Sequence, residues 1–254
     1  MRSSALATLV MTALLALTAC APSAPVQKPT VDRKTLAETN LELGLQYMRG
    51  REYQTAMDKL KKAIELDPRM VEAHNAMALL HATLGQNDQA EASFKHALGL
   101  DGANSAVLNN YGQFLCQRKR YDEGQKLFAK AAENPLYKNP EMVFFNAGSC
   151  AMNAGKLDVA EDFFRKSLEI DRTLAPALLQ MADLSFQLGR HLQARGYLQR
   201  YINVAEHSPK SLWLGIQIER ALGDRNAESS YALLLEKNFP DSPQTKLLLD
   251  SKSQ

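Results

Sequence analysis

The sequence is poor in the residues that build disulfide frameworks, large β-sheets and metal clusters. Its 254 residues include three cysteines and one tryptophan, and aromatic residues make up 7%. Three cysteines are too few for a disulfide-stapled or cysteine-rich metal domain, and so few aromatics argue against a large β-sandwich. The formal net charge is only +2, which gives no basis for nucleic-acid binding.

The motifs of common active sites are also missing. The sequence has no Gly-rich phosphate loop, no Gly-x-Ser-x-Gly and no His-Glu-x-x-His. Ser149 and Cys150 are adjacent nucleophile types, but an expected helix interior without a nearby histidine is a poor place for either to react. We therefore expect no enzyme activity and no cofactor site.

Histidines and acidic residues carry no stronger signal. His74 and His81 are seven residues apart, with His96 nearby, and they occupy positions where the repeat described below needs bulky core residues. We interpret them as packing residues rather than metal ligands. Glu161-Asp162 is interpreted as part of a solvated helix face rather than a catalytic acid pair.

Only one apolar run approaches the character of a membrane span, and it lies at the N-terminus. Arg2 precedes the run 5–17, which is shorter than the roughly twenty residues of a membrane-spanning helix and is typical of a signal peptide. The run leads to Leu17-Thr18-Ala19-Cys20, which resembles the lipobox of bacterial lipoproteins. The resemblance implies cleavage before Cys20 and acylation of its thiol and new amino group. The alternative is an ordinary signal peptide cut near Ala19 or Ala21.

These features predict a lipoprotein signal peptide over 1–19, then the lipidated Cys20 and a tether over 20–34. Pro22, Pro25 and Pro29 favour an extended tether. Ala21, rather than Asp, follows the cysteine, which by resemblance to bacterial lipoproteins implies transfer to the outer membrane. Several acyl chains would anchor the protein stably. We therefore expect a lipid-anchored outer-membrane protein that faces the periplasm.

The remainder, residues 35–254, repeats with a period close to 34. Ala90-x-x-x-Phe94-x-x-Ala97 recurs as Ala160-x-x-x-Phe164-x-x-Ser167. Apolar spacings of three and four indicate helices, and a glycine at the middle of the unit ends the first helix. The pattern resembles the tetratricopeptide repeat, which implies an all-α fold, a right-handed solenoid of helix-turn-helix units.

We expect six units and a terminal capping helix. Small residues such as Gly44 and Ala56 are expected where the two helices of a unit approach closely. One helix pair cannot bury its own apolar face, so neighbouring units must stack and a cap must cover the last surface. Unit three is longer by a loop at 134–140. Units one to six and the cap span 37–70, 71–104, 105–140, 141–174, 175–207, 208–241 and 242–250.

Cys116 and Cys150 lie late in the first helices of units three and four. Stacked helices lie about 9–10 Å apart, and a disulfide needs Cα atoms within about 7 Å, which such neighbours can achieve. An oxidising compartment would favour the bridge. The alternative is a pair of buried free thiols.

Solenoids bind partners on their inner wall, and the first helices of the units should line it. Two apolar stretches are predicted there, separated by a polar middle. Apolar residues on an exposed face mark interaction sites, and a groove of this kind fits an amphipathic helix or an apolar peptide terminus. The alternative is that curvature or the N-terminal segment covers them. The groove at the N-terminal end comprises Leu41, Leu45, Met48 and Leu79, and the second patch comprises Met142, Phe145, Met152, Leu179 and Phe186.

The combination of Leu17-Thr18-Ala19-Cys20, a proline-rich tether, the segment Leu41-Glu42-Leu43-Gly44-Leu45-Gln46-Tyr47 and six repeats resembles the pilotin lipoproteins of type IV pilus biogenesis, of the PilF/PilW type. The resemblance implies that the protein binds subunits of the outer-membrane secretin. It also implies that the lipoprotein sorting machinery carries this complex to the outer membrane, where the secretin multimerises. The alternative is a generic periplasmic scaffold lipoprotein for envelope assembly or cell-wall enzymes.

Overall fold

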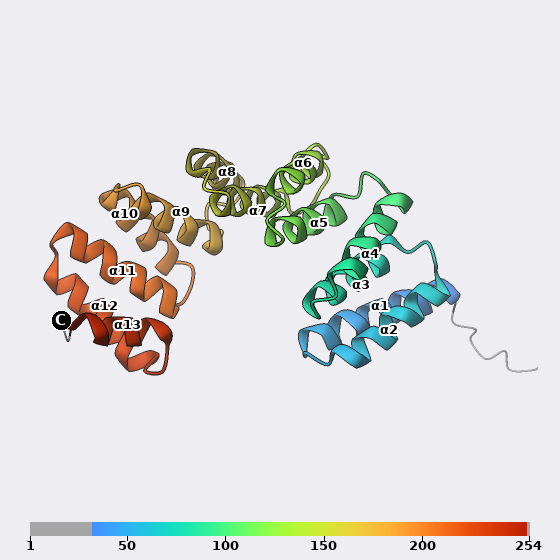
Figure 1. The fold of residues 1–254 in the computed structure, drawn as a ribbon, viewed down its shortest axis with the longest axis horizontal. Coiled ribbons are helices and arrows are strands. Elements are labelled where there is room, and N and C mark those ends of the chain that lie inside the picture. The colour runs from blue at the N-terminus through green and yellow to red at the C-terminus, as the bar shows by residue number, and fades with distance from the viewer. Residues whose placement is uncertain (1–31, 253–254) are drawn as a thin grey trace, which may run out of the picture. The chain divides into compact units, whose positions relative to one another are not determined.

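The computed structural model describes residues 32–252, in which all regular structure is α-helical. Six helix pairs follow one another in chain order, with one helix after them (Figure 1). The expected all-α solenoid of helix pairs is confirmed. The first helices of the pairs are α1 (Arg33–Arg49), α3 (Val71–Thr83), α5 (Ser105–Gln117), α7 (Pro140–Asn153), α9 (Ala175–Gln187) and α11 (Pro209–Leu222). The second helices are α2 (Tyr53–Leu66), α4 (Asn87–Leu100), α6 (Tyr121–Ala132), α8 (Leu157–Ile170), α10 (His191–Ile202) and α12 (Arg225–Asn238), and the last helix is α13 (Pro243–Lys252).

The turn inside each pair needs one residue with left-handed backbone geometry. Gly85 has φ of +72° in the turn between α3 and α4, a conformation that costs glycine nothing. In the first and third pairs, Arg51 and Lys119 hold this geometry at φ of +61°, which is strained for a residue with a side chain. The predicted role of a mid-unit glycine therefore holds in four pairs, and two pairs make the same turn without it.

Close contact within each pair depends on small residues facing large ones. Ala90 and Phe94 of α4 are fully buried, as are Ala160 and Phe164 of α8. A Cβ atom added to Gly44 would lie 2.7 Å from Leu60 Cδ2, so no larger residue fits there without displacing the leucine. Burying a large apolar side chain contributes about 1.5–3 kcal/mol, which makes these repeated contacts the main stabilising element of each unit.

Neighbouring pairs touch through the first helix of the later pair, which packs against both helices of the pair before it. The backbones of α1 and α3, α3 and α5, α5 and α7, α7 and α9, and α9 and α11 approach closely, whereas within residues 32–252 those of successive second helices do not. Each second helix instead packs against the first helix of the next pair. The first helices therefore form one continuous face, called the inner face below.

The two ends of the described chain are covered in different ways. Arg33 Nε and Nη2 donate hydrogen bonds to the carbonyls of Leu66 and Glu65, at 2.8 and 2.9 Å, and so satisfy the C-terminus of α2. At the other end, Leu248 of α13 is buried and joins the apolar cluster of Leu212. No helix in the described part of the chain is both long enough and apolar enough to cross a membrane.

Candidate partner-binding surface

The inner face brings together most of the N-terminal groove predicted above. Leu41, Leu45 and Met48 of α1 are half-buried and pack on one apolar cluster, which includes Leu60 and Leu80. Their spacing of four and three residues places them on one stripe of the helix. Leu79 is also half-buried but packs on the neighbouring cluster of α4 and α5. These side chains therefore support the core and keep part of their surface accessible.

The second predicted patch shows the same behaviour in α7 and α9. Phe145, Met152, Leu179 and Phe186 pack on the largest core cluster and stay half-buried. Phe145 is tilted against the buried ring of Phe164, with ring centroids 6.0 Å apart. Met142, the remaining member of the patch, is half-buried but does not pack on this cluster.

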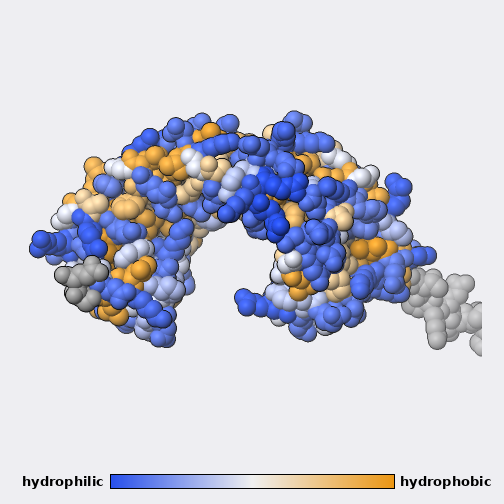
Figure 2. All heavy atoms as spheres, in the orientation of Figure 1, coloured by the Kyte–Doolittle hydropathy of each residue, from blue (hydrophilic) through white to orange (hydrophobic). Residues whose placement is uncertain are grey.

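A row of carboxamides separates the two apolar stretches. Asn110 Nδ2 donates to Asn75 Oδ1 at 3.3 Å, and Asn146 Nδ2 donates to Asn109 Oδ1 at 3.0 Å. Each hydrogen bond joins the first helices of adjacent units, so the polar residues also set the stacking register. Figure 2 shows hydrophilic residues around the junction of α5 and α7 and hydrophobic patches over the pairs to either side.

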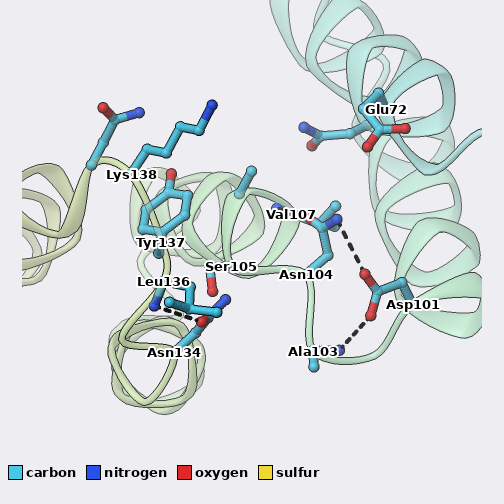
Figure 3. A pocket seen from close by; sticks show the side chains of 13 residues that line it. Glu72, Asp101, Ala103, Asn104, Ser105, Val107, Asn134, Leu136, Tyr137 and Lys138 are labelled. Atoms are coloured by element: carbon cyan, nitrogen blue, oxygen red, sulfur yellow. Dashed lines mark hydrogen bonds between the residues drawn. The ribbon is translucent and has the colours of Figure 1, made fainter.

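A polar cavity of about 520 Å³ opens beside this row. In Figure 3, Glu72 of α3 lies on one side of the α5 N-terminus, and Leu136, Tyr137 and Lys138 lie on the other. The loop that carries these last three residues is the predicted extra length of unit three, and Leu136 is 87% exposed in it. The cavity thus combines a helix N-terminus, an acidic side chain, a basic side chain and an exposed leucine.

Ser105, at the start of α5, is the most unusual residue of this cavity. It is only 3% exposed, and within residues 32–252 its Oγ has no hydrogen-bond partner. Asn104 caps the helix by accepting the amide hydrogen of Val107, at 3.2 Å. A buried hydroxyl without a partner costs free energy, and no sequence pattern distinguishes Ser105 from an ordinary helix start.

Cys116 and Cys150 form a disulfide that joins α5 to α7, with Cα atoms 5.5 Å apart. Gly124 of α6 makes room for it, because an added Cβ would collide with Cys116 Sγ and lie 2.8 Å from the Gly112 carbonyl oxygen. Most other units have alanine at this position, for example Ala90 and Ala160. The glycine is therefore the sequence signal that accompanies the bridge.

Buried ion pairs at the unit junctions were missed by the sequence analysis. The interpretation of Glu161 as solvent-facing is wrong, since it is 8% exposed and accepts hydrogen bonds from Arg165 and Arg190 at 2.5 and 2.8 Å. The hydrogen bonds from Arg165 and then Arg190 lower its pKa against the opposing effect of burial. Asp162 beside it is exposed, as expected.

Glu91 occupies the equivalent position two junctions earlier, between units two and three. Lys95 and Arg120 approach its carboxylate to 2.8 and 2.6 Å, and Tyr111 donates its hydroxyl at 3.0 Å. These hydrogen bonds, that of Lys95 foremost, lower the pKa of Glu91 to about 2. Both carboxylates thus remain charged at neutral pH and hold adjacent units together.

The histidines do not converge on a common point. His74 lies with its ring centroid 4.3 Å from that of His96, whereas His81 hydrogen-bonds to Gln86 at 2.6 Å. Across residues 32–252, no three His, Cys, Asp or Glu side chains are placed to hold a metal ion. Cys20, the predicted lipidation residue, lies outside the described residues.

Comparison with known proteins agrees with this architecture. Tetratricopeptide-repeat family models match residues 41–105, 83–135, 143–174 and 176–206. The type IV pilus assembly protein PilF of Pseudomonas aeruginosa is 32% identical over 238 residues, which cover 93% of this chain and 94% of that protein.

Two solved structures resemble the described fold over nearly their whole length. The structure of Pseudomonas aeruginosa PilF has a TM-score of 0.77 and 32% identity, covering 86% of this chain and 99% of that one. The structure of PilW, a widely conserved type IV pilus biogenesis factor, has a TM-score of 0.78 and 31% identity, covering 84% and 98%.

Proposed function

Because the chain belongs to the PilF/PilW family of tetratricopeptide-repeat proteins of type IV pilus biogenesis, we propose that it acts as a pilotin. In this role it binds subunits of the outer-membrane secretin and promotes their localisation and multimerisation there. The protein works by binding rather than by catalysis. The observation that carries the proposal is the match to PilF along 93% of the chain.

The groove residues of α1 supply the proposed contact with the secretin. Leu41, Leu45 and Met48 form an apolar stripe at the first unit, and each keeps part of its surface accessible. An amphipathic segment of the partner can place its own apolar stripe against them. Because the stripe also supports the core, the partner meets a preformed and rigid surface, which lowers the entropic cost of binding.

The proposed anchor is Cys20, the predicted site of acylation. Acyl chains at this position bring the protein, with its bound secretin subunit, to the outer membrane through the lipoprotein sorting machinery. The Cys20→Ser variant should keep the helical fold and lose outer-membrane secretin rings. Normal rings with that variant would contradict the carrier role.

Binding is tested by co-purification of the secretin with L41E/L45E. The charges should sharply reduce the secretin recovered, whereas circular dichroism should show unchanged helicity. L247E/L249E is the matched control, since both leucines are 51% exposed on α13, away from the first unit. The milder Leu45→Gln covers the case in which the double variant does not fold. Secretin recovery unchanged in both groove variants would refute this site.

A generic envelope scaffold makes a different prediction. Deletion of the protein should abolish secretin multimers in the outer membrane if it is a pilotin. A scaffold for cell-wall enzymes would leave these multimers intact. Separation of heat-resistant secretin multimers by electrophoresis distinguishes the two functions.

A further inference from the structure

On the side away from the inner face, the second helices α8 and α10 border a cavity of about 540 Å³. We call it the α8–α10 cavity. Three guanidinium groups and a single carboxylate line it, so its own lining carries an excess of two positive charges. Its members are Arg165, Leu168, Glu169, Arg172, Tyr197 and Arg200.

Two of the three arginines are held in position by the protein. Arg165 donates from Nη2 and Nε to Glu161 Oε1, at 2.5 and 3.2 Å. Arg200 lies over the ring of Tyr197, 5.4 Å from its centroid, and donates from Nη2 to the Arg172 carbonyl at 3.1 Å. Their guanidinium groups therefore need little reorganisation to bind a ligand.

The third arginine is not engaged. Within residues 32–252, no hydrogen bond or ion pair joins the Arg172 guanidinium to another group, and its carbonyl alone is used, by Arg200. Glu169 shares the cavity and forms no ion pair with these arginines. The lining thus contains an unneutralised cation beside two fixed ones.

An arginine can also stabilise the C-terminus of a helix, because that end carries a partial negative charge. This explains one hydrogen bond of Arg200, since Arg172 follows the end of α8. It does not account for the guanidinium of Arg172 or the remaining donors of Arg200. The corresponding end of α2 is satisfied by Arg33 without any cluster of arginines.

Planar guanidinium forks match the oxygens of phosphate, to which they bind by paired, charge-assisted hydrogen bonds. The unpaired Arg172 and the remaining donors of Arg200 leave the lining cationic, which favours an anionic group of this kind. We propose that the α8–α10 cavity binds a phosphate group, carried either by a soluble phosphate ester or by a phospholipid headgroup. This site is independent of the inner face and of secretin binding.

The primary test titrates glycerol 3-phosphate into the purified full chain and follows the Nε–Hε signals of arginine by NMR. All variants carry Cys20→Ser, so that no acyl group contributes. Arg172 and Arg200 signals should shift saturably, and R172A/R200A should weaken binding by at least about tenfold. R172K/R200K keeps the charge without the fork and should bind with intermediate strength.

K61A/R69A is the matched control. Like R172A/R200A, it removes two positive charges, here from α2 and the turn that follows it. The two turns are equivalent: Asp67 Oδ1 accepts a hydrogen bond from the Arg69 amide, and Asp171 Oδ1 accepts one from the Thr173 amide. This variant should bind glycerol 3-phosphate normally, and circular dichroism should show all variants folded. Absence of saturable binding, or equal affinity for the wild type and R172A/R200A, would overturn the proposal.

Vesicle sedimentation then distinguishes the two sources of the phosphate group. If the ligand is a lipid headgroup, phosphatidylglycerol vesicles should retain the Cys20→Ser chain, R172A/R200A should reduce retention, and phosphatidylcholine vesicles should retain none. If glycerol 3-phosphate binds saturably but vesicles retain nothing, the ligand is a soluble ester. Vesicle retention that R172A/R200A leaves unchanged, without saturable binding of the ester, contradicts the site.

Discussion

Two junctions between adjacent units are built from the same repeat positions but are joined differently. Units three and four are linked covalently by Cys116–Cys150. Units four and five are linked by Glu161, which pairs with Arg190 of the next unit. At the position equivalent to Glu161, unit three has Gln125, whose Nε2 donates to the Ala147 carbonyl at 2.8 Å.

The difference shows how a repeat protein can alter one junction without altering the fold. Where the disulfide is present, a neutral amide replaces the carboxylate and Gly124 replaces the usual alanine. Where it is absent, a buried carboxylate supplies the connection and is charged at neutral pH. The first junction therefore depends on oxidation, and the second depends on pH.

The largest expected effect comes from removing the covalent link. C116A/C150A frees a loop closed over 34 residues, which should lower the free energy of unfolding by about 3–4 kcal/mol through the entropy of the unfolded chain. Urea denaturation of the oxidised wild type and the variant measures it. The reduced wild type is the control and should unfold like the variant. If the unfolding free energies of the oxidised wild type and the variant differ by less than about 1 kcal/mol, the bridge contributes little to stability.

Gly124→Ala should have the next largest effect. The new Cβ meets Cys116 Sγ and the Gly112 carbonyl, and overpacking of this kind costs about 1–3 kcal/mol. The same substitution in C116A/C150A should cost less, because one of the two obstacles is gone. A double-mutant cycle of unfolding free energies measures this coupling, and a coupling of zero would exclude the disulfide as the reason for the glycine.

Glu161→Gln should weaken the ionic junction by about 1–2 kcal/mol, because the charge that strengthens the hydrogen bonds from Arg165 and Arg190 is lost while the arginines stay partly solvated. The lowered pKa of Glu161 means that its contribution is fully present above about pH 5 and is lost as the pH falls through its folded pKa. The stability difference between wild type and variant should therefore shrink in acid. Glu169→Gln, on the exposed side of α8, is the control and should change little; a difference independent of pH would rule out this linkage.

The smallest effect is expected at the surface of the covalent junction. Lys156 Nζ lies 3.0 Å from Asp122 Oδ1, with both side chains more than half exposed. Exposed pairs contribute about 0–1 kcal/mol and are screened by salt. Lys156→Ala should therefore shift the thermal midpoint slightly at low salt and not at high salt. A loss as large as that of Glu161→Gln would show that the pair acts with the disulfide.

The fold was predictable from the sequence because its determinants are local. Ala90 and Phe94 of unit two recur as Ala160 and Phe164 of unit four, and the structure buries all four. Each such pair specifies the packing of two helices within a single unit. The repeat also placed Cys116 and Cys150 at similar heights on neighbouring helices. The spacing of the repeated residues therefore predicted most of the architecture.

The ion pairs between units were harder to predict from the sequence. Glu161 and Arg190 are 29 residues apart, and each resembles an ordinary surface charge on its own helix. The same offset joins Glu91 to Arg120, so the recurrence itself was the available signal. Ser105 offers no such signal, since it lines a cavity together with the extra loop of unit three.

The pattern of contacts between units has a consequence for how the chain folds. Among the helices of residues 32–252, each touches only those of its own or adjacent units, and α13 touches only α11 and α12. Such a chain has low contact order, so folding can begin at any unit and spread outward. Oxidation of Cys116 and Cys150 would fix two central units as neighbours at the start, and the middle of the array then becomes the preferred nucleus from which both ends grow.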